Sequence, residues 1–411
     1  MRHSPMRKLR RALSAVGPGL FLIGYNIGTG SVTTMAKSGA EHGMSLFWAL
    51  LLSCVFTFVL MVAYGQVTLV TGKTALNNFK SHLKYGHMLA IYIMIALILG
   101  ELLALMGIMG IVSELLQEGG RLVFGVVIHT VWIISVLVIA LYLLLWYGRY
   151  QMFERLLTGC VIVMGLCFVL VFFMVKPSFT ALLRGMIPNV PNEPGAFRLV
   201  AATAGTTCSA AVFVMRSTVI AEKGWDISNL AGEKRDAFVS AFMMLFLSGV
   251  IMAVSAGTLN VMGLKLNNSV EMISLFEPLG GKVAAFILIL GITGAGLSTV
   301  FPIILIAPWL ISDYTGRPRD IRSPLYRILG LTGALFGFGM VFMKQRPPAV
   351  MVFSQAVQAC ILPAVAIPMF ILINNRTVMK DHVAKTKMNI GLIAVIVFAL
   401  FTTYFAIVEL F

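Results

Sequence analysis

Eleven long apolar runs dominate this sequence of 411 residues. As a helix, a run of about 18 residues or more can cross a hydrocarbon core roughly 30 Å thick. The candidate spans cover approximately residues 15–37, 45–71, 87–116, 123–146, 155–175, 198–220, 237–262, 282–311, 326–343, 349–373 and 388–410. Charged residues make up only 11% of the chain, too few to solvate a soluble globule. The sequence therefore predicts an all-helical, polytopic membrane protein and excludes a water-soluble enzyme.

The charges lie in short segments between the spans. They comprise 31 Lys and Arg against 16 Asp and Glu, a formal net charge of +15. Most of the basic residues fall in the segments on the N-terminal side of the membrane, which by the positive-inside rule is the cytoplasmic side. We therefore expect an inner-membrane protein with a cytoplasmic N-terminus, whose partner is the lipid bilayer and not nucleic acid.

The spans divide into two blocks of five. No connecting segment is long enough for a separate soluble domain, so residues 1–411 are expected to form a single transmembrane domain. The first repeat covers about 15–175, the second about 198–373, and an extra helix about 388–410. Because each block has an odd number of spans, the second is inverted relative to the first.

The first span of each block is interrupted by small and polar residues. The interruptions run from Tyr25 to Ser31 and from Ala204 to Ser209. Matched interruptions in two repeats are typical of discontinuous helices around a transporter's central site, which predicts unwinding near Gly28 and Gly205. The simpler alternative is that these small residues only let helices pack closely.

Several motifs lie in the order and spacing of a known family. They are Gly17-Pro18-Gly19, Gly39, Gly43 and Ser45 to Trp48, then Tyr147 to Glu154, then Ser354-Gln355, Leu362-Pro363 and Ile367-Pro368. Together they resemble the NRAMP family of divalent-metal transporters. The resemblance implies a LeuT-like 5+5 inverted repeat with eleven transmembrane helices, the first and sixth discontinuous, and a divalent metal ion as the transported substrate.

The family's metal-binding motifs are absent, as in a divergent bacterial branch. Gly28 to Ser31 stand where the family has Asp-Pro-Gly-Asn, and Cys208 to Ala211 where it has Met-Pro-His. Neutral oxygens favour hard, partly hydrated ions, which predicts weak binding of Mg²⁺ or of a broad range of divalent ions. The candidate metal ligands are the side chains or carbonyls of Asn26, Gly28, Thr29, Ser31, Gly205, Thr206, Thr207, Cys208 and Ser209.

Two ionisable residues are expected deep in the membrane. Glu101 matches a family glutamate on the proton route, but Ile108 replaces the acidic residue seven positions later. This departure makes proton coupling doubtful. Arg216 must pair or face water, and Glu101 is its most economical partner. The two residues therefore form either a structural ion pair or what remains of a proton route.

Two further functions remain open. A LeuT-fold transporter of a small organic or anionic solute would use Arg216 and the positive ends of half-helices. A membrane sensor or scaffold would keep the fold without transport. Walker, Rossmann and catalytic motifs are missing from the sequence, so we expect neither enzymatic activity nor a cofactor. The protein is expected to be a monomer.

Overall fold

The computed structural model describes residues 28–147, 150–317, 319–343 and 345–409, and every regular element in these ranges is a helix. The first half of the described chain contains α3 (Thr29–His42), α4 (Phe47–Thr71), α5 (Ala75–His82), α6 (Gly86–Phe124), α7 (Thr130–Tyr147), α8 (Tyr150–Val175) and α9 (Phe179–Gly185). The second half contains α10 (Ala196–Thr207), α11 (Ala210–Glu222), η1 (Ile227–Asn229), α12 (Leu230–Gly257), η2 (Ser269–Leu279), α13 (Gly281–Thr315), α14 (Pro324–Phe336), α15 (Gly339–Phe342), α16 (Pro347–Ala359), α17 (Leu362–Ile373), α18 (Arg376–Met379), η3 (Lys380–His382) and α19 (Thr386–Val408).

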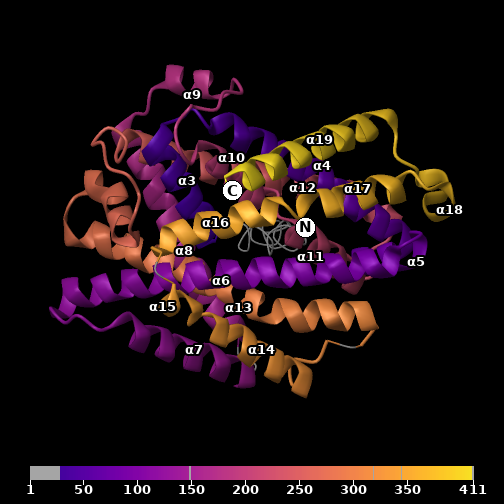
Figure 1. Cartoon of the computed structure of the whole chain (residues 1–411), viewed down its shortest axis with the longest axis horizontal. Coiled ribbons are helices and arrows are strands. Elements are labelled where there is room, and N and C mark those ends of the chain that lie inside the picture. Colours follow the sequence, from indigo (N-terminus) through magenta and orange to yellow (C-terminus); the bar gives the residue numbers. More distant parts are fainter. Residues whose placement is uncertain (1–27, 148–149, 318, 344, 410–411) are drawn as a thin grey trace, which may run out of the picture.

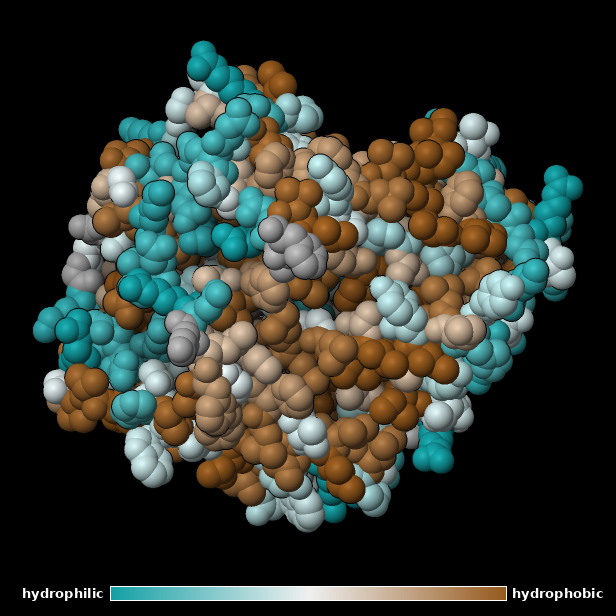
Figure 2. Space-filling view, in the orientation of Figure 1, coloured by the Kyte–Doolittle hydropathy of each residue, from teal (hydrophilic) through white to brown (hydrophobic). Residues whose placement is uncertain are grey.

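Ten membrane spans can be recognised in the described residues by length and hydropathy. They correspond to the second to eleventh predicted spans, and the all-helical membrane fold is confirmed. The first predicted span, 15–37, lies largely outside the described residues, and α3 is its described part. Figure 2 shows apolar side chains across the middle of the molecule, with polar side chains gathered towards its two ends. A bilayer-spanning protein requires this distribution.

The sixth span is broken, as the sequence predicts, but the break lies at Cys208 and Ser209 and not at Gly205. Cys208 ends α10 with φ −106° and ψ 48°, and Ser209 precedes α11 in an extended conformation. Gly205 remains helical. A Cβ at Gly205 would lie 1.8 Å from the carbonyl oxygen of Gln355, so this glycine serves the close contact between α10 and α16.

The tenth span is also broken, which the sequence did not predict. Helix α16 ends at Ala359 and α17 begins at Leu362, after Cys360 and Ile361. Pro363 follows at the second position of α17, where its missing N–H does not interrupt the helical hydrogen bonds. The break was hidden because its residues are apolar and resemble the helix around them.

The central packing joins segments that are far apart in the chain. Helix α10 packs against α16, α3 packs against α12, and α6 packs against both α13 and α16. In Figure 1, α6 crosses the molecule below α16, with α7 and α14 at the edge beyond it. Glycines permit these approaches: a Cβ at Gly39 would lie 2.3 Å from the carbonyl oxygen of Met252 in α12. The two broken spans are thereby brought next to α3 and α6.

Candidate functional site

A small cavity lies where the broken spans meet. Its volume is about 30 Å³, enough for one or two waters or a partly dehydrated ion. Helices α3, α6, α13 and α16 and the α10–α11 break contribute to its wall. The lining residues are Gly28, Gly30, Ser31, Glu101, Ala104, Ile108, Thr206, Ser209, Thr299, Ile303, Met351, Gln355 and Gln358. Among the described residues, the cavity is therefore lined by glycine backbone, hydroxyls, amides, one carboxylate and several apolar side chains.

The α3 wall of the cavity has no room for side chains at its glycines. Gly28 precedes the first residue of α3, and a Cβ there would lie 2.3 Å from Oγ1 of Thr299. A Cβ at Gly30 would lie 2.5 Å from the terminal methyl of Met351 and 3.0 Å from Nε2 of Gln355. These glycines let the α3 backbone approach α13 and α16 directly.

Hydroxyl groups connect the helices around the cavity. Ser31 of α3 and Thr206 of α10 share a hydrogen bond of 3.0 Å between their hydroxyl oxygens. Ser209, at the break, donates to Oε1 of Gln358 in α16 at 3.3 Å. These four residues and Gln355 are all buried. Neutral oxygen atoms from four segments of the chain therefore lie together in the cavity wall.

The predicted ligands fall into two groups. Gly28, Ser31, Thr206 and Ser209 line the cavity. Four other candidates do not line the cavity; they are Thr29, Gly205, Thr207 and Cys208. Asn26 lies outside the described residues.

The remaining candidates are used in helix packing. Thr29 donates to the carbonyl of Ile292 in α13 at 3.3 Å, and Thr207 donates to the carbonyl of Thr203 at 2.6 Å. Cys208 is 1% exposed and belongs to an apolar cluster with α4 and α17, and Gly205 contacts α16. These positions hold the break in place around the cavity.

Sequence reasoning missed the contribution of α13 and α16. Thr299, Met351, Gln355 and Gln358 all line the cavity, although none of them was a candidate ligand. The glutamines were detectable in principle, because polar side chains are rare in spans and tend to face protein or water. Met351 carried no such signal, since methionines are spread through the apolar runs.

The predicted ion pair between Arg216 and Glu101 is wrong. Nε of Arg216 lies 2.6 Å from Oε1 of Glu233, and Nη2 lies 2.8 Å from Oδ2 of Asp236. Arg216 is on α11 and both acids are on the following helix α12, one turn apart, so they face the same side of that helix. Glu101 lies instead in the cavity wall. We refer to Arg216, Glu233 and Asp236 as the buried ion cluster.

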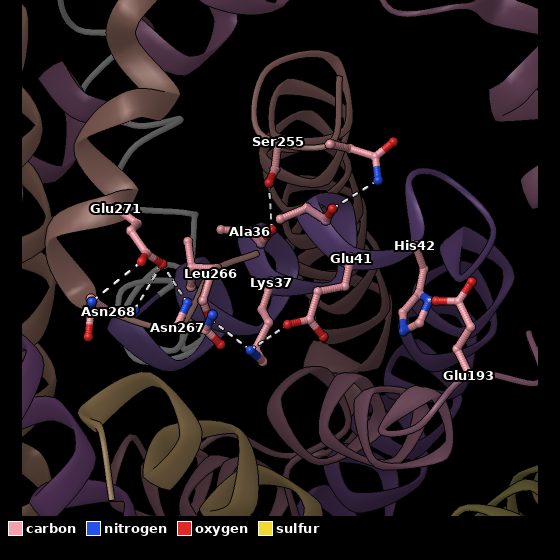
Figure 3. Close-up of polar contacts among 12 residues, drawn as sticks. Ala36, Lys37, Glu41, His42, Glu193, Ser255, Leu266, Asn267, Asn268 and Glu271 are labelled. Carbon is pink, nitrogen blue, oxygen red and sulfur yellow. Dashed lines mark hydrogen bonds and ion pairs between the residues drawn. The ribbon is translucent and has the colours of Figure 1, made fainter. Parts of the chain in front are cut away.

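A second polar group secures the far end of α3, and Figure 3 shows it in detail. Nζ of Lys37 contacts Oε1 of Glu41 at 2.6 Å and donates to the carbonyl of Leu266 at 2.7 Å. Ser255 and Asn260, at and beyond the end of α12, donate to backbone carbonyls of α3. We call these contacts the α3 clamp. They close the contact between α3 and α12 at the end remote from the cavity.

The same end of α3 contacts the segment that leads into α10. Nδ1 of His42 lies 3.2 Å from Oε2 of Glu193, with the His42 side chain 2% exposed. This contact is also visible in Figure 3. The end of α3 is thus connected to the segment before α10 and, through the α3 clamp, to the segment after α12.

Replacing Lys37 by Met is expected to loosen the α3 clamp. The change removes two hydrogen bonds and leaves the Leu266 carbonyl without its donor, at a cost of about 1–3 kcal/mol. Hydrogen exchange of the amides in residues 258–268 should become faster, while exchange in α13 stays unchanged. Lys265→Met is the control, because Lys265 is exposed in the same loop. Equal exchange in parent and Lys37→Met would contradict a clamping role.

The described part of the chain has ten apolar spans, two of them broken beside a polar cavity, and this arrangement is that of a membrane transporter of the LeuT-like fold class. The chain belongs to the Nramp family: the family model described as natural resistance-associated macrophage protein-like matches residues 19–409. A divalent metal cation transporter, MntH, of Erwinia tasmaniensis is 24% identical over 404 residues, covering 96% of this chain and 94% of that protein.

Solved structures agree on the fold. The manganese transporter of Eremococcus coleocola superposes with a TM-score of 0.71 at 16% identity, covering 98% of this chain and 87% of that one. Mhp1, a transporter of the nucleobase-cation-symport-1 family, gives a TM-score of 0.60 at 14% identity over 95% of this chain and 92% of its own. The LeuT-like fold class predicted from the sequence is confirmed, and the chain is a membrane protein of the Nramp family.

Proposed function

We propose that the transported divalent cation binds in the cavity at the helix breaks, with weak affinity and broad selectivity. The observation that carries this proposal is the set of neutral oxygens from Ser31, Thr206, Ser209, Gln355 and Gln358 around a volume of about 30 Å³. Hydroxyl and amide oxygens suit hard, partly hydrated ions such as Mg²⁺ and Mn²⁺. No imidazole or thiol lines the cavity among the described residues.

Among the described residues of the wall, Met351 alone carries a soft donor atom, and its position is that of a packing residue. A Cβ at Gly107 would lie 3.0 Å from the Met351 sulfur, and a Cβ at Gly30 would lie 2.5 Å from its methyl. The side chain therefore fills the space between α6 and α3, a role that suits a flexible thioether. This position supports broad selectivity over a preference for soft metals.

Transport of an organic or anionic solute is less well supported. The buried ion cluster commits Arg216 to two carboxylates, so its charge is not available to an anion in the cavity. Pockets that enclose drug-sized molecules are about 300–1,000 Å³, far larger than this cavity of about 30 Å³. These two observations favour a small cation.

We propose the cytoplasmic membrane as the location, with the N-terminus in the cytoplasm and a monomer as the working unit. The distribution of Lys and Arg supports this orientation. In this orientation, α3 runs from the cytoplasmic towards the extracytoplasmic side of the membrane, so the α3 clamp lies on the extracytoplasmic side. The buried ion cluster lies towards the cytoplasmic end of α11, beyond the cavity. Proton coupling is not part of the proposal, because Ala104 and Ile108 continue the Glu101 face of α6 with apolar groups.

Uptake by reconstituted protein tests the proposed function. Proteoliposomes are expected to take up Mg²⁺ and Mn²⁺ in mutual competition, without a requirement for a pH gradient. Thr206→Val should reduce uptake of both ions about tenfold, because it removes one hydroxyl from the cavity wall without changing the shape of the side chain. Thr203→Val is the matched control, since Thr203 is buried one turn earlier on α10 but does not line the cavity.

Cys208 offers a second control. Cys208→Ala should leave uptake unchanged, because the thiol is buried in apolar surroundings outside the cavity. Tight, selective Mn²⁺ binding by calorimetry that survives Cys208→Ala would refute the broad, weak site. Absence of flux for every divalent ion would instead favour a sensor or scaffold.

A further inference from the structure

We propose that Glu101 is a direct ligand of the transported cation and supplies the negative charge of the site. This inference rests on the proposed function and identifies the residue that makes the cavity a cation site. In this role the carboxylate stays ionised, binds the dication and releases it on the other side of the membrane. It differs from the role of proton carrier, in which a carboxyl group binds and releases protons and need not touch the metal.

The packing places Glu101 at the level of both helix breaks. A Cβ on the neighbouring Gly100 would lie 3.3 Å from Cγ of Gln358 and 3.3 Å from Cδ1 of Ile361, the residue at the α16–α17 break. Gln358 in turn accepts a hydrogen bond from Ser209 at the α10–α11 break. Glu101 is 4% exposed and lines the cavity. The carboxylate therefore belongs to the same layer as the neutral oxygen donors.

Among the residues that the structure describes, one residue gives the cavity wall its charge. Of the described residues that line the cavity, Glu101 alone is ionisable. Removing a dication from water into a buried site is costly unless a nearby negative charge compensates it. Neutral hydroxyls and amides supply only part of that compensation, whereas a carboxylate is a strong ligand for hard divalent ions. Cation binding in this cavity thus depends on Glu101.

The other walls cannot take over this role. On the α3 side, a Cβ atom at Gly28 would overlap Thr299 and one at Gly30 would overlap Met351. Neither position can therefore carry a side chain. The buried ion cluster does not line the cavity, and its charges pair with one another. Along its own helix, the residues on the Glu101 face that line the cavity are Ala104 and Ile108, both apolar. Neither apolar residue can accept a proton from Glu101.

Equilibrium binding by the full-length protein in detergent tests the inference, with Mg²⁺ and Mn²⁺ as the probes and no pH gradient present. Glu101→Gln keeps the shape of the side chain but replaces the carboxylate by a neutral amide with a single acceptor oxygen. We expect its affinity for both ions to fall at least tenfold. Glu101→Asp retains the charge on a shorter side chain and should recover part of the lost affinity.

Glu114→Gln is the matched control. Glu114 lies on the same helix α6, but its carboxylate accepts from the backbone N–H of Ser269, away from the cavity. Its loss should leave cation affinity unchanged. Thermal unfolding and size-exclusion profiles of all variants, recorded without metal, separate a loss of ligand from a loss of fold.

Two results would overturn the inference. If the parent protein transports divalent cations and Glu101→Gln binds them with unchanged affinity, Glu101 is not a ligand. If uptake by Glu101→Gln also loses a dependence on the pH gradient that the parent shows, Glu101 is a proton carrier. If the parent neither binds nor transports any divalent cation, the proposed function fails and this inference fails with it. Should Glu101→Gln not fold, unchanged binding by Glu101→Ala relative to the parent would serve as the same refutation.

Discussion

Arg216→Met is expected to lower the free energy of unfolding by about 3–5 kcal/mol, because it removes the positive charge that Arg216 brings to two buried carboxylates. Arg216 and Glu233 are 0% exposed and Asp236 is 5% exposed. Glu233 also packs against α4, since a Cβ at Gly65 would lie 2.5 Å from its Oε1. The change therefore disturbs the contacts of three helices. Thermal or denaturant unfolding of the purified protein measures the effect.

A charge-balanced variant separates the ion pairs from the packing. Arg216→Met combined with Glu233→Gln and Asp236→Asn removes all three charges together and should be much closer to the parent in stability. Arg235→Met is the control for loss of a positive charge, because Arg235 is exposed on the same turn of α12 and exposed charges contribute little. If the triple variant loses as much stability as Arg216→Met alone, unpaired charge is not the cause.

Gly205→Ala is expected to separate α10 from α16. The new Cβ would lie 1.8 Å from the Gln355 carbonyl oxygen and 3.0 Å from the backbone nitrogen of Ala359. Both are backbone atoms of a helix, so the contact can be relieved only by moving one helix. Such overpacking costs about 1–3 kcal/mol or more. Because Gln355 and Thr206 line the cavity from these two helices, we also expect uptake to fall by an order of magnitude or more.

Gly232→Ala is the matched control for this change. Gly232 lies inside α12 and a Cβ there would meet nothing within 4 Å. Alanine is favoured over glycine in an open helical position by up to about 1 kcal/mol, so this variant should be as stable as the parent or slightly more stable. Stability and uptake of Gly205→Ala equal to those of the parent would show that α10 and α16 do not pack this closely.

Part of the cavity could be predicted from the sequence. The stretches around Ser31 and Thr206 were recognisable because small polar residues interrupt otherwise apolar runs at the same position in both repeats. Glu101 was recognisable because an acidic residue in a span is rare. All three line the cavity. Their mutual proximity follows from the fold, and the role of each as a ligand stays a prediction.

The partner of Arg216 could not be predicted in the same way. Hydropathy places the start of the seventh span at about residue 237, so Glu233 and Asp236 lie outside the predicted span. In the structure the helix begins at Leu230, and both acids are buried beside Arg216. A helix can extend well beyond its apolar run when its polar residues have partners inside the protein.

The sequence by itself determined the membrane-spanning class, the helical content and the break in the sixth span. These depend on local properties: apolar runs long enough to cross a bilayer, and small polar residues inside one of them. Only the tertiary structure decided which side chains meet. The break in the tenth span, the contact of Gly205 with α16, the pairing of Arg216 with α12, and the place of Gln355 and Gln358 beside Glu101 depend on how each helix is rotated and packed. Hydropathy along one chain carries no information on that rotation, because packing is set by the shapes of surfaces that are distant in sequence.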